Sequence, residues 1–194
     1  MTALANTKGD ASVNSAAGYN HGNFGLAGAI TTAVNDIKTN ALVDSAVNFI
    51  DASSITSKAV SNLNISSDAI GSMPEDKKTG STGVGVGAGI AVDVTNIETT
   101  SNIREIKHSG DTKLNNISVT AQNTGKQTMS VRAGSEGGVS VTPVAGVMVT
   151  GAYVEAVLGN PSQETTEYCF DVNGDILVDA LNNIERSLQT NAAA

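Results

Sequence analysis

Apolar residues alternate with small or polar residues along most of this chain, which predicts β-strands that direct one face to an interior. The alternation is clearest at Val139, Val141, Val147 and Val149, and we expect these valines to face the core. Clusters of Asn, Thr and Gly, such as residues 122–125, predict polar turns between short strands. Residues 41–50 carry spaced apolar side chains that fit a short amphipathic helix, or an edge or loop, which we favour.

A Gly-spaced apolar run occurs three times. Its copies begin near Phe24, Val84 and Val139, so they are 60 and 55 residues apart. In the second copy Gly85, Gly87 and Gly89 alternate with larger residues, which leaves one face of the strand without side chains. We expect close backbone approach or tight stacking at that face.

A second marker, an Ile-x-x-x-Ala frame, begins at Ile55, Ile117 and Ile176, with Met1 in the equivalent place. Its spacings are 54, 62 and 59 residues, close to those of the first marker. Two markers that advance together predict a tandem repeat in which each unit stacks on the next. The units we predict are 1–54, 55–116 and 117–175, followed by 176–194 as the start of a fourth unit or a C-terminal cap.

The expected fold is all-β, a parallel β-helix or β-solenoid of about three repeats of 54–62 residues. The chain has 3 Phe, 3 Tyr and no Trp among 194 residues, which suits a narrow interior better than a globular core. Each repeat has room for two or three coils, or for a hairpin-based unit. Residues 73–78 are interpreted as a loop insertion, and residues 182–188 as a short helix that caps the C-terminal end.

The charge of the chain argues against several partner classes. Its 19 acidic and 11 basic residues give a net charge of −8, with Lys77 and Lys78 as the only basic pair, so nucleic acid is not expected as a partner. No apolar run approaches a membrane span, and the N-terminus lacks the basic and apolar regions of a signal peptide. We therefore expect a piece of a longer repeat protein, without membrane insertion.

Candidate sites for chemistry are few. Asp171, Asn173 and Asp175 alternate as at the start of a calcium loop, but Ile176 stands where such a loop has Gly, and Asn182 where it has Glu. The repeat register instead assigns residues 176–180 to a strand. We therefore predict no metal site, no cofactor and no catalytic residues, and leave calcium binding at residues 171–175 open.

The remaining reactive side chains have structural interpretations as well. Cys169 is a lone thiol without a nearby histidine in sequence, and His21 and His108 occupy non-equivalent loops. Asp93, Glu98 and Glu155 lie on predicted strands, where a pair of them would be needed for glycoside hydrolysis. A further set of threonines is a candidate for an exposed ice-binding ladder, but its spacing is too irregular for one: Thr31, Thr32, Thr95, Thr99 and Thr100.

Residues 117–145 resemble the repeats of large bacterial filamentous adhesins of the leukotoxin type and of related two-partner-secretion exoproteins and autotransporter passengers. The shared pattern is Ile-x-Val-x-Ala, a polar segment, Val-Arg-Ala-Gly, and Gly-Gly-Val-x-Val-x-Pro-Val-Ala. The resemblance implies an extracellular or surface-displayed fibre with adhesive or structural work, whose partner would be a cell-surface receptor or glycan. It does not identify the receptor.

Two other functions compete with this expectation. A polysaccharide-active β-helix enzyme would need two carboxylates facing one groove. A self-assembling fibre or tail-spike subunit would associate head to tail through its open ends.

Overall fold

The computed structural model describes residues 1–16, 18–21, 24–44, 47–72, 83–109, 111–135, 138–159 and 172–193. These residues form eleven β-strands and no helix. The strands are β1 (Thr2–Ala16), β2 (Tyr19–His21), β3 (Phe24–Val43), β4 (Asn48–Ile50), β5 (Ser54–Ser72), β6 (Val84–Ile103), β7 (Lys107–Ser109), β8 (Asn116–Gly134), β9 (Val139–Val141), β10 (Val144–Leu158) and β11 (Ile176–Ala193). The all-β prediction is confirmed for this part of the chain.

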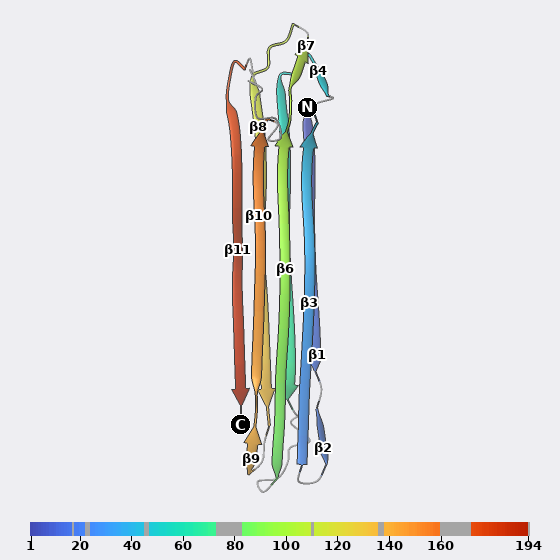
Figure 1. The fold of residues 1–194 in the computed structure, drawn as a ribbon, viewed down its shortest axis with the longest axis vertical. Coiled ribbons are helices and arrows are strands. Elements are labelled where there is room, and N and C mark those ends of the chain that lie inside the picture. The colour runs from blue at the N-terminus through green and yellow to red at the C-terminus, as the bar shows by residue number, and fades with distance from the viewer. Residues whose placement is uncertain are drawn as a thin grey trace.

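Two sheets of long strands lie face to face (Figure 1). Sheet A has the order β1-β5-β8-β11, and sheet B has the order β10-β6-β3-β2, with β9 also paired to β6. All long strands within a sheet are parallel, and the strands of sheet B point opposite to those of sheet A. The chain therefore runs down one sheet and back up the other. The short strands β4 and β7 pair beyond one end of the two sheets.

The register of the strands reproduces the spacing of the two sequence markers. Ile55 pairs with Ile117, which pairs in turn with Ile176. Phe24 pairs with Val84, and Val84 pairs with Val139. Residues at the same place in successive repeats are therefore neighbours across a parallel ladder. One repeat corresponds to one pass through each sheet, fewer strands than the sequence predicted.

Two local predictions are wrong. Residues 122–125 lie inside β8 and do not form a turn. Residues 182–188 belong to β11 and not to a capping helix. The described part of residues 41–50 contains the end of β3 and the short strand β4, and not the helix that we considered less favourable there. The proposed insertion at residues 73–78 lies outside the described residues.

The interior changes character along the strands. At the end where β3 and β6 finish and β5 and β8 begin, large apolar side chains form a buried cluster that includes Phe49, Ile55, Ile103 and Ile117. Toward the other end, a smaller cluster contains Ala69, Ala91, Met129 and Val131. Burial of aliphatic side chains drives the two sheets together at both places.

Polar side chains fill the middle of the interior. Asp93 is fully buried, and its carboxylate accepts hydrogen bonds from the hydroxyls of Ser67 (2.9 Å) and Thr95 (2.8 Å). The Thr95 hydroxyl accepts in turn from the amides of Asn35 (3.1 Å) and Gln127 (3.2 Å). These bonds link strands of both sheets, so the polar groups around Asp93 satisfy one another.

At the glycine-rich end the backbones of the two sheets touch. A Cβ atom added to Gly87 would lie 2.6 Å from the carbonyl oxygen of Gly134, and one added to Gly89 would lie 2.8 Å from that of Arg132. One at Gly71 would lie 1.8 Å from the carbonyl oxygen of Ala88. The expectation of close backbone approach at the glycine face is confirmed.

The orientation predicted for the valines is wrong. Val139, Val141, Val147 and Val149 are exposed on the outer face of sheet B. On β10 the alternate positions, Gly146 and Met148, face Met129 and Val131 of the opposite sheet, so Val147 and Val149 point outward.

Candidate functional site

The possible calcium loop is only partly described. Asp171 and Cys169 lie outside the described residues, whereas Ile176 begins β11 as the repeat register predicts. Asn182 is on the inner face of β11, where its side-chain oxygen accepts a hydrogen bond from Asn123 (3.2 Å). Asp179 lies an odd number of residues from Asn182 and so projects to the opposite face. These two residues do not converge on one ion.

The two histidines lie at opposite ends of the molecule. His21 is in β2 and His108 is in β7, and these strands are at the two extremes of the long axis (Figure 1). The structure therefore does not bring them into one site. Among the described residues, no group of three His, Cys, Asp or Glu side chains is placed to hold a metal ion.

The acidic strand residues divide between the interior and the surface. Asp93 is buried inside, whereas Glu98 and Glu155 are on the outer face of sheet B, on the neighbouring strands β6 and β10. Glu98 forms an ion pair with Lys38 at 3.2 Å, and Tyr153 pairs across the ladder with Glu98. The sequence did not indicate this surface cluster, because its members come from three different repeats.

Hydrogen bonding defines the electrostatics of this cluster. A hydrogen bond with Glu98, reinforced by its negative charge, raises the pKa of Lys38. A hydrogen bond with Glu155 raises the pKa of Tyr153, with smaller contributions from burial and from the charges of Glu155 and Glu98. Lys38 and Tyr153 therefore keep their protons to a higher pH than usual because their pKa values are raised, and both carboxylates are engaged by neighbours on an outer sheet face.

The threonines do not form an exposed ladder. Thr31, Thr95 and Thr99 are buried in the interior, whereas Thr32 and Thr100 lie on the outer face. Thr31 donates a hydrogen bond to the backbone carbonyl of Asp68 at 2.7 Å, so it contributes to the packing between the sheets.

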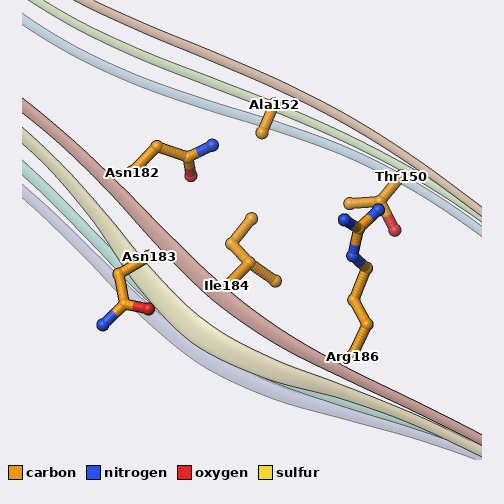
Figure 2. Close-up of a pocket in the computed structure, with 6 residues that line it drawn as sticks. All are labelled: Thr150, Ala152, Asn182, Asn183, Ile184 and Arg186. Carbon is orange, nitrogen blue, oxygen red and sulfur yellow. The ribbon is translucent and has the colours of Figure 1, made fainter.

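A groove of about 400 Å³ lies between β10 and β11 at the last level of the stack. Its lining residues are Thr150 and Ala152 from β10 and Asn182, Asn183, Ile184 and Arg186 from β11. Figure 2 shows the side chains of Asn182, Ile184 and Arg186 in the space between β11 and the opposite sheet. This set offers amides, a guanidinium and an aliphatic surface, which suits binding and provides no pair of acid and base groups.

The groove is bordered by two strand edges. In the part of the chain that the structure describes, β11 pairs with β8 alone, and β10 pairs with β6 alone. Each therefore presents backbone N–H and C=O groups on its other side, which is the usual template for addition of another strand.

A cavity lined by described residues of the interior is, in contrast, small. A cavity of about 10 Å³ lies between Leu63, Ile97 and Gly125, among others. That is about the volume of one water-sized probe, so it does not hold a substrate. Binding surfaces among the described residues are consequently on the outer faces and at the strand edges.

Within the described ranges, no helix is long and apolar enough to cross a lipid bilayer. Comparison with protein families, with curated proteins and with solved structures found no match to this chain.

Proposed function

We propose that this chain is a stretch of parallel β-solenoid that serves as a structural and binding segment of a secreted or surface-displayed bacterial protein, as in the filamentous adhesins that its repeats resemble. The observation that carries the proposal is the register: equivalent residues of successive repeats pair in parallel through both sheets. Such stacking is the structural basis of an array of repeats.

In this proposal each coil consists of one strand in sheet A and one in sheet B. The first coil contains β1 and β3, the second β5 and β6, and the third β8 and β10, and β11 begins a fourth. The polar bonds around Asp93 connect coils as well as sheets, since Asn35, Thr95 and Gln127 belong to three successive coils.

Binding would occur on the outer faces, because the described interior cavity, of about 10 Å³, is too small for a ligand. Outward side chains recur at the same height on adjacent strands, as Lys38, Glu98 and Tyr153 do on sheet B. A ligand with repeated groups, such as a glycan or a clustered receptor, would contact several rows at once and gain from multivalency. The partner proposed is a receptor or glycan of a host or neighbouring cell.

The experiment that tests this function measures adhesion and hydrolysis with the same preparation. Latex beads coated with the folded chain are incubated with cultured epithelial monolayers, and beads coated with the heat-unfolded chain serve as the control. We expect adhesion only with the folded chain, and no release of reducing sugar from soluble polysaccharides. Release of sugar that is lost in Glu98→Gln or Glu155→Gln would contradict the proposal and favour an enzyme.

A second candidate, a self-assembling fibre subunit, is favoured by the open edges of β10 and β11 and by the groove between them. Strand addition at these edges would extend the stack without a natural end. Sedimentation velocity over a range of concentrations distinguishes the two, because end-to-end addition gives species whose mass keeps rising.

A further inference from the structure

The outer face of sheet B is apolar over half of its length. From the row of Phe24 to the row of Val34, side chains on β3, β6, β9 and β10 that point outward are almost all aliphatic. We name this region the valine face, and its exposed members include Ile30, Val34, Ile90, Val94, Val147 and Val149. Val34 is 74% exposed and Ile30 is 70% exposed, so nothing in the described chain covers them.

The valine face is specific to one sheet. On the outer face of sheet A, the positions that point outward on the central strands β5 and β8 include Lys58, Asn62, Thr124 and Lys126. The two outer surfaces of the same molecule therefore differ in polarity. The polar outer face of sheet A is stable in contact with water. The apolar outer face of sheet B is of the kind that other elements normally cover in parallel sheets.

The size of the valine face is sufficient for a protein interface. Eleven residues along a strand at ~3.3 Å each and three strands at ~4.8 Å spacing give a projected area of about 500 Å². Two such faces in contact would bury about 1,000 Å² in total, which is the lower end of specific protein interfaces. Exposed apolar patches of this size on soluble proteins usually mark interaction sites.

Two features indicate what covers the valine face. The bordering rows carry Asp36, Glu98 and Glu155 but one cation, Lys38, which is already paired with Glu98 at 3.2 Å. An acidic border disfavours the anionic surface of a membrane. The patch itself is uncharged and rich in β-branched side chains, the type that interdigitates when two sheets pack face to face.

We propose that the valine face is the interface with a second copy of this chain, packed sheet B against sheet B about a two-fold axis. Such an interface is self-complementary, because the same apolar rows meet on both sides. It closes at two copies and leaves the edges of β1, β10 and β11 free. End-to-end association, in contrast, uses the strand edges and does not stop at two copies.

The test is sedimentation velocity of the chain and of Val94→Lys, from about 1 µM to about 1 mM. Val94 lies on the middle of the three strands of the face, between Val34 and Val149 in the row that ends it, so a lysine there places a charge inside the interface. We expect the wild-type mass to reach a plateau at twice that of the chain, and the lysine variant to weaken dimerisation at least tenfold. Val94→Thr, which keeps a β-branched side chain, should weaken it less.

Leu4→Lys is the matched control. Leu4 points outward on β1, an edge strand of sheet A, and is 64% exposed, so the same charge enters an exposed apolar position on the other sheet. We expect this variant to dimerise as the wild type does. Far-UV circular dichroism of each variant establishes that the strands are retained.

Several outcomes would overturn the proposal. A wild-type chain that stays monomeric at the highest concentration, or a Val94→Lys variant that dimerises unchanged, excludes the valine face as a self-association surface. A mass that rises without a plateau and is insensitive to Val94→Lys assigns association to the strand edges. Co-sedimentation of a monomeric chain with phosphatidylcholine vesicles, lost in Val94→Lys, assigns the face to a lipid surface instead.

Discussion

Individual glycines determine how closely the two sheets approach. Gly71 is the extreme case, because a Cβ atom there would overlap the carbonyl oxygen of Ala88 at 1.8 Å. At Gly28 on β3, by contrast, an added Cβ atom would meet nothing within 4 Å. Substitution at Gly71 therefore tests the role of glycine in packing, whereas substitution at Gly28 tests its effect on backbone entropy.

We predict opposite effects of Gly71→Ala and Gly28→Ala on the free energy of unfolding. The first forces the sheets apart and should destabilise the protein by about 1–3 kcal/mol. The second restricts the unfolded chain without a clash and should be neutral or stabilising by up to about 1 kcal/mol. Urea unfolding followed by circular dichroism measures both. Equal effects of the two substitutions would show that the sheets are not in backbone contact at Gly71.

Asp93 is the residue on which the polar interior depends. Replacement by Ala leaves the hydroxyls of Ser67 and Thr95 without their acceptor, and we expect a loss of about 2–4 kcal/mol. Asp93→Asn retains the shape and one acceptor and should cost less, since both hydroxyls can reorient. Urea unfolding tests the order. An alanine variant as stable as the wild type would mean that these bonds contribute nothing net.

Alkaline pH should weaken the surface cluster of sheet B. Because the pKa values of Lys38 and Tyr153 are both raised in the folded state, their contribution to stability is fully present below their ordinary pKa values, near about 10. It is lost as the pH rises through the raised folded values. Glu155→Gln should move the pKa of Tyr153 back toward its ordinary value.

The pKa of Tyr153 is followed by NMR of tyrosine labelled at the ring carbon that bears the hydroxyl. Glu185→Gln is the control, because Glu185 lies on β11 in the other sheet. If the pKa of Tyr153 is unchanged in Glu155→Gln, the hydrogen bond with Glu155 is not what raises it.

At the scale of strands, the sequence predicted register better than strand length. The spacings from Ile55 to Ile117 and Ile176 are those of the ladder, because a parallel stack pairs each residue with its repeat equivalent. The predicted turn at residues 122–125 failed because Asn123 and Gly125 have interior roles. Asn123 bonds to Asn182, and Gly125 lies against the backbone of Leu63. Composition alone does not distinguish these roles from a turn.

The valine face and the surface cluster could not be predicted from the sequence, because both depend on which face of each strand points inward and on which strands are paired. Alternation shows that a strand has two different faces, but it does not show which one is inside. Val147 and Val149 point outward because Gly146 and Met148 of the same strand face Met129 and Val131 of the opposite sheet, which is a long-range contact. The cluster of Lys38, Glu98 and Tyr153 depends on pairing between three repeats.

The rate of amide hydrogen exchange should differ between the strands of sheet A. β5 and β8 are paired on both sides, whereas β11 is paired on one. We expect slow exchange for the amides of β5 and β8 and fast exchange for alternate amides of β11, those that point away from β8. Amide-resolved NMR at concentrations below those of association tests this. Uniformly slow exchange along β11 would show that its second edge is covered.

At the scale of the whole molecule, two kinds of surface remain available for assembly. The strand edges of β10 and β11 lie at one end of the stack, and the valine face lies on its side. Association through the strand edges lengthens the stack, whereas association through the valine face doubles its thickness. A protein that used both would form a paired ribbon in which sheet A, with its polar outer surface, faces solvent on each side.

The long coil also sets how far such a protein extends per residue. Each repeat of about 60 residues advances the stack by one strand spacing of ~4.8 Å, or ~0.08 Å per residue. An α-helix, by comparison, rises ~1.5 Å per residue. A span of ~100 Å would thus require on the order of 1,200 residues. The same coil is nearly 20 residues wide in each sheet, or ~65 Å across. This geometry gives little length along the stack and a large exposed area on its two outer faces.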